Sequence, residues 1–299
     1  MIRRTRKGGA ALLLALWALF LLSAMVISWA LDINTRLTLN GHAGRMLEAE
    51  AMASSGAEIA LDPATKPTSS LLRQKRGNQS FEARITGEGG RLNLNWIVAG
   101  ENPVRLELLR QYLENRGVEQ NDRDHMIDCL LDWVDPDNLV RLNGAEADGD
   151  YRPANALLRH IDDVKEIRGW EKFTSDPNWD ADFTITSTGP IDLAWASRDV
   201  LLSLPGFTEP MVEQFLTLRA GPDGVEGTED DAPFNSMDDI RNALSLSPDQ
   251  FKALAPVIGF KDQVLRVVSV GRSSDVTHVV RMVFRKTGSM PQLISWKEF

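Results

Sequence analysis

An uncharged segment of 22 residues, running from Ala10 to Leu31, is the feature that most constrains this chain of 299 residues. A helix rises 1.5 Å per residue, so the segment would span about 33 Å, enough to cross the hydrocarbon core of a bilayer. Four cations precede it: Arg3, Arg4, Arg6 and Lys7. Because positive charge is retained on the cytoplasmic side, we expect a single-pass protein with a cytoplasmic N-terminus and its body across the membrane.

The first residues fit three kinds of segment: a plain signal anchor, a cleaved signal peptide, or a leader like that of type IV pilins. A signal peptide has an apolar core of about 7–15 residues and a small-x-small cleavage site. This apolar segment is longer, and the bulky Trp29 occupies the middle of Ser28–Ala30. Arg-Lys-Gly-Gly before Ala-Ala-Leu-Leu-Leu resembles the pilin-like leader, which predicts cleavage between Gly9 and Ala10, or after Gly8.

The fifth position of the predicted mature chain is unusual for a pilin-like protein. Most pilins and pseudopilins have Glu there, but this chain has Leu14, or Leu13 if cleavage follows Gly8. An ionised carboxylate is costly in lipid unless it finds a partner. In pilin assembly the Glu is thought to pair with the N-terminal amine of a neighbouring subunit. A subunit without it suits the tip of a filament, where no further subunit docks.

Composition excludes several classes of function. The leader to residue 9 holds four of the 33 cations and none of the 42 acids, so the remaining chain carries −13. Such a charge disfavours nucleic-acid binding. The single cysteine, Cys129, lies in an apolar helical pattern and is expected to be buried and inert, and four scattered histidines predict no zinc site. We find no catalytic motif and predict that the protein is not an enzyme.

The pattern of apolar residues predicts an α+β fold. One helix should continue over residues 32–60 until Asp62-Pro63, and alternation predicts strands at 81–85 and 91–95 that form a first hairpin. A second hairpin is predicted at 264–270 and 276–284, with a short strand at 292–296. Helical periodicity fills the interval, with helices predicted at 103–116, 122–134, 161–168, 197–204, 209–220, 237–243 and 247–255.

An ordered set of short sequence words resembles one family. These words are GRLNLN (90–95), LLDWVD (130–135), NGAE (143–146), YRPAN (151–155), IDDV (161–164), IRG (167–169) and VLLSLPGF (200–207). Together with the Glu-less leader, they resemble general secretion pathway protein K, a minor pseudopilin of the type II secretion system. The resemblance covers nearly the whole chain, and the order of the words makes it specific.

The resemblance implies a pilin-like long N-terminal helix and small antiparallel sheet, interrupted by a large all-helical insertion domain. On this chain, we expect a basic leader (1–9), a transmembrane helix (10–31), a pilin-like helix with the first hairpin (32–96), the insertion (97–260) and the returning strands (261–299). It also implies an inner-membrane anchor, a periplasmic body, leader removal by prepilin peptidase, and a complex with pseudopilins I and J at the tip of the periplasmic pseudopilus.

Two acidic loops are candidate calcium sites, because Ca²⁺ prefers carboxylate and carbonyl oxygens. The first is AGPDGVEGTEDD (220–231), whose spacing is not that of an EF-hand. The resemblance implies calcium in the helical part, and the ligand candidates are Asp223, Glu226, Glu229, Asp230 and Asp231. The second loop, residues 135–150, is also acidic, but Arg141 and Arg152 offer ion-pair partners and turn chemistry explains it without metal. An ordinary solvated loop is the alternative for both.

One segment suggests a different function. LLSLPGF (201–207), followed by a predicted helix at 209–219, resembles half of a helix-hairpin-helix, which binds the DNA backbone through N–H groups at a helix N-terminus. The usual second glycine is Thr208 here, and acidic residues flank the segment. The alternative function is therefore a membrane-tethered periplasmic DNA-binding module, which the negative charge of the body disfavours.

Overall fold

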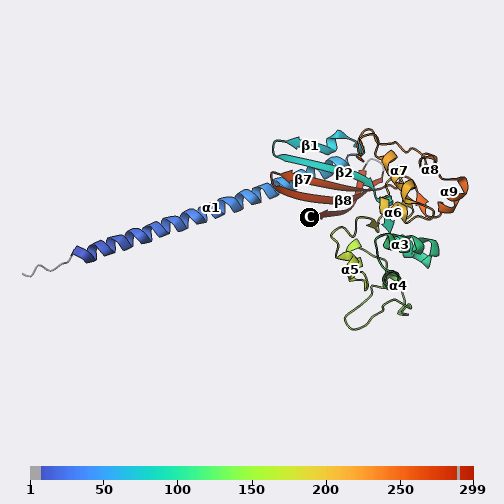
Figure 1. The fold of residues 1–299 in the computed structure, drawn as a ribbon, viewed down its shortest axis with the longest axis horizontal. Helices are drawn as coiled ribbons and strands as arrows, with labels where there is room; N and C mark the ends of the chain where they lie inside the picture. Colours follow the sequence, from blue (N-terminus) through green and yellow to red (C-terminus); the bar gives the residue numbers. More distant parts are fainter. Residues whose placement is uncertain (1–7, 288–289) are drawn as a thin grey trace, which may run out of the picture.

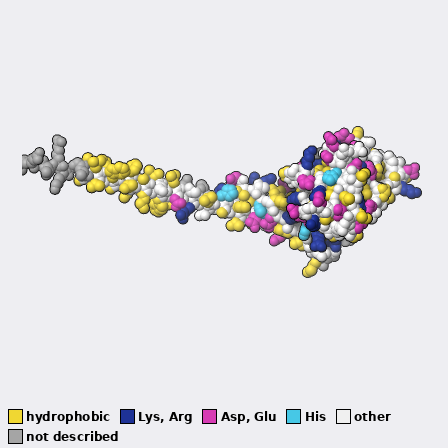
Figure 2. Space-filling view, turned by 90° about the horizontal axis from the view of Figure 1, so that it is seen from below, with side chains coloured by type: hydrophobic (Ala, Val, Ile, Leu, Met, Phe, Trp, Pro, Cys, Tyr) yellow, Lys and Arg dark blue, Asp and Glu magenta, His cyan; other side chains and the backbone are white. Residues whose placement is uncertain are grey.

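The computed structural model of the chain describes residues 8–287 and 290–299, so the predicted leader residues 1–7 lie outside the described part. Helix α1 (Gly8–Leu61) is 54 residues long, and its N-terminal portion projects from the head as a rod (Figure 1). The rod is covered with apolar side chains toward its N-terminal end, whereas charges are mixed over the head (Figure 2). Among the described residues, α1 is long and apolar enough to cross a membrane, with a window of mean hydropathy 2.5.

A five-stranded antiparallel sheet receives the C-terminal part of α1. Its order is β1-β2-β7-β8-β9, so β2 and β7 are neighbours although the whole helical insertion separates them in sequence (Figure 1). The strands are β1 (Arg73–Arg76), β2 (Gln79–Gly87), β7 (Val264–Ser273), β8 (Val276–Thr287) and β9 (Met290–Glu298). The predicted second hairpin and last strand are confirmed, each with longer strands than the pattern indicated.

The first predicted hairpin has the wrong partner strand. Residues 79–87 do form β2, but β2 pairs with β1 and β7 rather than with residues 91–95. Those residues divide between β3 (Leu92–Asn93) and helix α2 (Leu94–Val98), because the Asn93 side chain accepts a hydrogen bond from the Trp96 N–H at 3.1 Å. Asparagine is a strong N-cap, and here the cap overrides the alternation of Leu92 and Leu94.

Small residues let α1 lie very close to the sheet. The alanines that face it are buried, namely Ala49, Ala53, Ala57 and Ala60. A Cβ added at Gly56 would stand 2.4 Å from Ser269 Oγ, and one at Gly271 would stand 2.1 Å from the Ala49 carbonyl oxygen. The helix and the sheet therefore meet almost backbone to backbone at these positions, and buried apolar side chains such as Met282 and Phe284 complete the core.

The helical insertion has a bulkier core. Its helices are α3 (Pro103–Asn115), α4 (Gln120–Val134), α5 (Glu171–Thr174), α6 (Arg198–Leu202), α7 (Glu209–Arg219), α8 (Met237–Ala243) and α9 (Pro248–Leu254). Residues 161–166 form a 3-10 helix, and two-residue strands occur at β4 (Phe183–Thr184), β5 (Ile191–Asp192) and β6 (Ile258–Gly259). Helix α4 begins two residues before the predicted start at 122, with Glu119 as its N-cap and Asp122 in its first turn. Trp170, Tyr112, Phe183 and Phe215 are fully buried.

A buried ion pair lies where the insertion meets the sheet. Glu88 follows β2 and accepts two hydrogen bonds from Arg266 of β7, at 2.8 and 2.7 Å. Thr184 of the insertion donates to the same carboxylate at 2.6 Å. Burial alone would raise the pKa of Glu88, but Arg266 and Arg91 outweigh it and hold the pKa below its usual value. The carboxylate is therefore ionised at the junction of the two parts.

Candidate functional site

The first acidic loop, between α7 and α8, uses most of its carboxylates to hold its own backbone. Asp223 accepts from the Val225 N–H at 2.8 Å, and Asp230 accepts from the Asp223 N–H at 3.0 Å. Asp231 accepts from the Gly227 N–H at 2.6 Å. These bonds favour the ionised form, and the pKa of Asp230 is lowered by Thr228 and by the Asp223 N–H.

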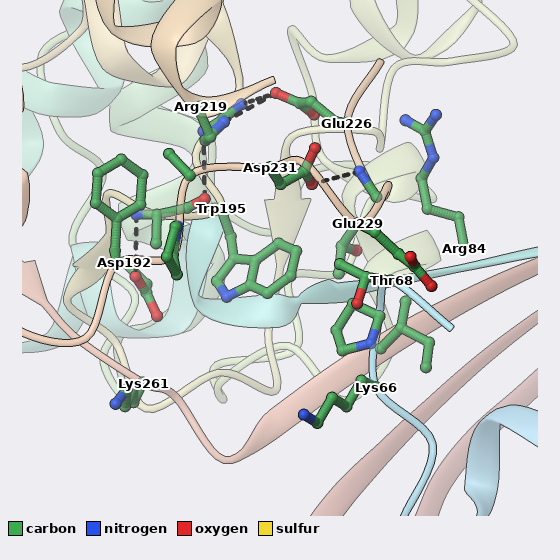
Figure 3. Close-up of a pocket in the computed structure, with 18 of the residues that line it drawn as sticks. Lys66, Thr68, Arg84, Asp192, Trp195, Arg219, Glu226, Glu229, Asp231 and Lys261 are labelled. Atoms are coloured by element: carbon green, nitrogen blue, oxygen red, sulfur yellow. Dashed lines mark hydrogen bonds and ion pairs between the residues drawn. The ribbon is translucent and has the colours of Figure 1, made fainter. Parts of the chain in front are cut away.

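Glu226 of the same loop has a cationic partner. Its Oε1 accepts from Arg219 Nε at 2.8 Å, and Arg219 also donates to the Ala196 carbonyl oxygen at 2.7 Å. Glu229 is exposed and belongs to the wall of an adjoining cavity (Figure 3). Across the described residues, the five predicted ligands do not supply three carboxylates close enough to share one ion.

A cavity of about 730 Å³ lies between this loop and the sheet side of the head (Figure 3). Trp195 stands on its wall, and its ring packs so closely on Gly87 that a Cβ there would approach it to 2.3 Å. Cations and carboxylates both line the cavity, including Arg84, Lys261 and Glu229. The mixture of charges does not define a single ligand. The cavity is part of the junction between the two halves of the head.

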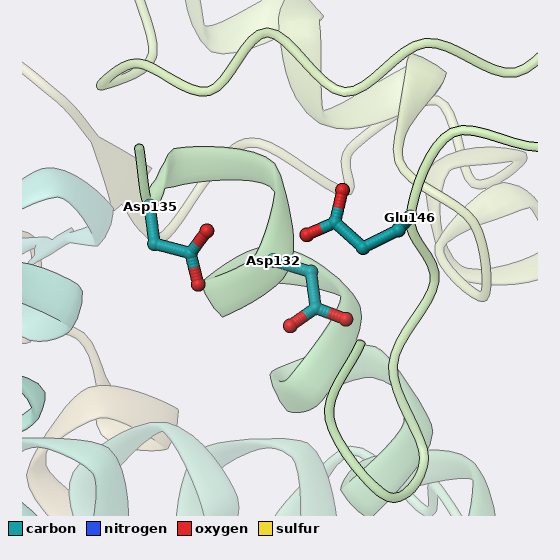
Figure 4. Close-up of side chains that lie close together, drawn as sticks. All are labelled: Asp132, Asp135 and Glu146. Atoms are coloured by element: carbon teal, nitrogen blue, oxygen red, sulfur yellow. The ribbon is translucent and has the colours of Figure 1, made fainter. Parts of the chain in front are cut away.

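The second acidic loop brings carboxylates together. Asp132 and Asp135 at the end of α4 and Glu146 after the following turn each offer an oxygen, and these atoms lie within 4.8 Å of one another (Figure 4). Asp132 is fully buried. We call these three residues the carboxylate triad. The turn can approach because Gly144 has no side chain: a Cβ there would stand 1.9 Å from Asp132 Oδ2.

Only part of the triad's charge is neutralised by protein groups. Arg141 pairs with Asp132 and Asp135, and also with Glu101 at 2.7 Å. Both carboxylate oxygens of Glu146 and Oδ1 of Asp135 are buried without a hydrogen-bond partner. Burial raises the pKa of Glu146, and the neighbouring Asp132 and Asp135 raise it further. Three carboxylates and one guanidinium leave a net charge of −2 with free oxygen ligands, which is a donor set that suits Ca²⁺.

The second loop is acidic in the sequence, but Asp132, the most buried candidate ligand, was not predicted. A signal was present, because Asp132 and Asp135 are three residues apart and residues at that spacing lie on one face of a helix. The loop brings Glu146 back to this face of α4 through the turn at Gly144, and no local sequence pattern predicts that turn. The sequence therefore contained two of the three ligands in a recognisable place and the third inside an apolar helix.

The helix-hairpin-helix-like segment is packed as protein core. Phe207 between α6 and α7 is buried, and Gly206 takes a positive φ of 83° to make the turn. The cation beside this turn, Arg198, is paired with Glu209 and Glu213 at the start of α7. A DNA phosphate would meet these carboxylates rather than a free cation. The DNA-binding alternative is not supported.

The fold defines a class before any relative is considered. A long N-terminal helix laid on a small antiparallel sheet is the architecture of a pilin-like subunit, here interrupted by a large helical insertion. The model of the family "Type II secretion system (T2SS), protein K" matches residues 90–177. The resemblance indicated by the sequence words is confirmed for this part of the chain.

Two individual proteins are similar to the chain. Type II secretion system protein K of Pectobacterium carotovorum subsp. carotovorum is 26% identical over 202 residues, which cover 56% of this chain and 59% of that protein. The aligned part thus spans about three fifths of that relative's length. A chain in the crystal structure of the GspK-GspI-GspJ complex from the type 2 secretion system of enterotoxigenic Escherichia coli matches with a TM-score of 0.56 at 12% identity, over 90% of this chain and 99% of that one. This second likeness confirms the fold.

Proposed function

We propose that the chain is a minor pseudopilin that caps the tip of a periplasmic pseudopilus and takes part in its assembly for protein export. The observation that carries the proposal is the size of the insertion at the head, beside the slender pilin-like part (Figure 1). Subunits in a filament stack their heads around a core of packed helices. A head widened by residues 97–260 fits best where no subunit stacks above it.

The apolar half of α1 supports the same position. Leu13 and Leu14, the two residues that can occupy the fifth mature position, are 59% and 71% exposed on a bare helix. Neither can offer a carboxylate to the amine of a following subunit. We place α1 in the inner membrane with its N-terminus in the cytoplasm and the head in the periplasm, because basic residues precede it and the large acidic body follows.

The partners that we propose are pseudopilins I and J. The similar chain belongs to the crystal structure of a GspK-GspI-GspJ complex, and the fold similarity covers 90% of the present chain. If the proposal is right, full-length protein extracted in mild detergent co-purifies with both pseudopilins in a fixed ratio. Recovery of the protein alone, from membranes in which both pseudopilins are present, would contradict it.

Processing of the leader gives a second test. We expect prepilin peptidase to remove the leader, and Gly9→Leu to block removal and reduce secretion. Gly8→Leu is the matched variant, because the cut follows either Gly8 or Gly9 and only one of the two changes should abolish it. N-terminal sequencing of the membrane-extracted protein reads the outcome directly. Normal processing and secretion in both variants would rule out this leader.

Calcium in the insertion is a further part of the proposal. The triad fits the ion because its free oxygens are buried and its charge is only partly neutralised. When bound, calcium would supply positive charge that fixes the loop after α4 against the end of that helix. The five acidic residues predicted in the first loop stay the alternative ligand set, namely Asp223, Glu226, Glu229, Asp230 and Asp231.

Titration calorimetry with CaCl₂ separates the two locations. Glu146→Gln should remove the binding isotherm if the triad holds the ion, whereas Glu229→Gln should leave it unchanged. The reverse result would move the site to the first loop. Absence of any binding isotherm in the unaltered protein would contradict the calcium proposal. The proposed filament role would be unaffected, because co-purification and leader processing test it separately.

A further inference from the structure

The loop after α4 exposes three large apolar side chains close together. Leu139 is 76% exposed, Val140 is 61% exposed and Leu142 is 96% exposed. Single exposed leucines are common on protein surfaces, but several on one short loop mark an interaction site. We call these three residues the apolar tip.

The base of the loop is held in place, so the tip is presented by a fixed structure. Arg141, between Val140 and Leu142, turns inward to Asp132, Asp135 and Glu101. The Leu139 N–H donates to Asp137 Oδ1 at 2.8 Å, which forms a local turn. A loop that is already ordered loses little conformational entropy when it binds.

Further bonds close the loop on both sides of the tip. Asn155 Nδ2 donates to the Asp137 carbonyl oxygen at 3.0 Å and to Asn138 Oδ1 at 3.1 Å. The Asn143 N–H and its side-chain amide both donate to Asp128 Oδ2, at 3.1 and 3.0 Å. Several polar groups of the loop are thus bonded to the protein, whereas the three apolar side chains of the tip are exposed to solvent. This is the reverse of the usual arrangement for a surface loop.

The tip lies on the insertion, away from the projecting part of α1 (Figure 1). The loop between α4 and α5 is at the lower end of the head in Figure 1, beyond the helices of the insertion as seen from the sheet. None of its residues belongs to α1 or to the five strands. The inference therefore goes beyond the proposed filament role and concerns a separate contact.

The charges around the tip indicate what it can bind. Asp137, Asp148 and Asp150 are exposed on the same loop. The nearby Arg152 donates to the Tyr151 carbonyl oxygen at 2.8 Å. Arg168 forms an ion pair with Asp148 at 3.9 Å. An anionic lipid surface attracts basic segments and repels acidic ones. A protein pocket with an apolar floor and a basic rim would instead match both the tip and its surroundings.

We propose that the apolar tip is a docking knob for a partner protein, which receives Leu139, Val140 and Leu142 in an apolar pocket bordered by Lys or Arg side chains. The tip supplies the buried area, and Asp137 and Asp148 supply complementary charge at the rim. Apolar anchors that enter a pocket carry most of the binding energy of such contacts, whereas rim charges act mainly on the association rate.

The test places a photoreactive diazirine amino acid at position 142 of the full-length protein in cells that carry the secretion system. The control places the same residue at position 71, since Leu71 is 55% exposed but lies beside the sheet. We expect an adduct with one partner peptide that contains apolar residues with Lys or Arg nearby. In the variant with Asp137→Lys and Asp148→Lys, the adduct yield should fall by roughly tenfold, because like charges then face each other at the rim.

A second set of variants keeps the result independent of the probe. Leu139→Ser with Val140→Ser should lower the adduct yield at position 142 at least about tenfold, because apolar area is lost from the contact. Val104→Ser, at a 45% exposed position on α3, should leave the yield unchanged. Lipid adducts alone, yields no higher than at position 71, or yields insensitive to both double variants would each overturn the proposal. Circular dichroism of each variant verifies that the helices remain folded.

Discussion

The two halves of the head are packed on opposite principles. Where α1 meets the sheet, the helix contributes alanines and Gly56, and the backbone of Ala49 nearly touches that of Gly271. In the insertion, the core consists of large side chains such as Trp170, Tyr112 and Phe183. The contact between α1 and the sheet requires small residues on the helix, whereas the core of the insertion requires large side chains. Addition or removal of side-chain volume should therefore affect the two halves differently.

Truncation of a large core residue in the insertion should have the greatest effect on the free energy of unfolding. Trp170 is fully buried, and its Nε1 donates to the Met126 carbonyl oxygen at 2.8 Å. Trp170→Ala should lower the free energy of unfolding by about 3–5 kcal/mol, because a cavity forms and a buried carbonyl loses its partner. Urea unfolding in detergent measures the change. An effect below about 1 kcal/mol would mean that the core is not packed as described.

The junction between the halves should be nearly as sensitive. Glu88→Gln leaves Arg266 buried without its carboxylate, and loss of one partner of a buried ion pair costs about 3–5 kcal/mol. Glu82→Gln is a suitable control, because Glu82 is 53% exposed in its pair with Arg73. That control should change stability by less than about 1 kcal/mol.

The same carboxylate predicts a dependence on pH. The pKa of Glu88 is held below its usual value by Arg266 and Arg91 against the effect of burial. A carboxyl with a lowered folded pKa contributes stability that is fully present above its unfolded value, near 4.3, and is lost as pH falls toward the folded pKa. Between pH 7 and pH 3, the free energy of unfolding should change less with pH for Glu88→Gln than for the unaltered protein. Parallel curves would contradict the assignment.

Addition of volume at the contact between α1 and the sheet should have a smaller effect than these two changes. Gly271→Ala adds a Cβ 2.1 Å from the Ala49 carbonyl oxygen and 2.3 Å from the Ala53 nitrogen, so the helix must shift, at a cost of about 1–3 kcal/mol. Gly44→Ala, on α1 where nothing lies within 4 Å, should be neutral or stabilise by about 0.5–1 kcal/mol. Hydrogen exchange of the α1 amides around residue 50 should accelerate in the first variant alone.

The smallest effect should be one whose sign depends on calcium. Burial and the charges of Asp132 and Asp135 raise the pKa of Glu146, so ionisation of this group destabilises the fold as pH rises from its unfolded pKa to its folded one. Without calcium, Glu146→Gln should stabilise the protein at pH 7 by less than about 1 kcal/mol. With calcium in excess, the same change should destabilise it, because a ligand is lost. Melting curves with EDTA and with CaCl₂ give both signs.

The contrast also explains what the sequence could predict. The apolar segment, the alternation of β7 and β8 and the amphipathic helices of the insertion each follow from local periodicity. Strand β1, Arg-Gln-Lys-Arg, has no apolar residue at all and is a strand only because β2 pairs with it. Residues 91–95 alternate like a strand but are capped into a helix by Asn93. Pairing with another strand decided the first case, and a local side-chain cap decided the second.

The candidate sites show the same limit. The density of carboxylates in residues 223–231 is visible in the sequence, but the structure uses those groups for local turns and for Arg219. The triad instead requires Asp132, hidden in an apolar helix, and a return turn at Gly144. Charge density indicates where oxygen ligands are available, whereas convergence depends on how the chain turns.

The position of β2 between β1 and β7 has a consequence for biogenesis. A chain that crosses the membrane with α1 leading delivers β2 early, but the strand that completes its pairing arrives only after the whole insertion has emerged. During that interval, the edge of β2 that will receive β7 is open to wrong pairing. The entropic cost of closing a loop rises only slowly with its length, so the long insertion does not by itself prevent the two strands from pairing. Compaction of residues 97–260 shortens the distance between them. Pairing of β2 with β7 is therefore expected to follow, rather than precede, compaction of the insertion.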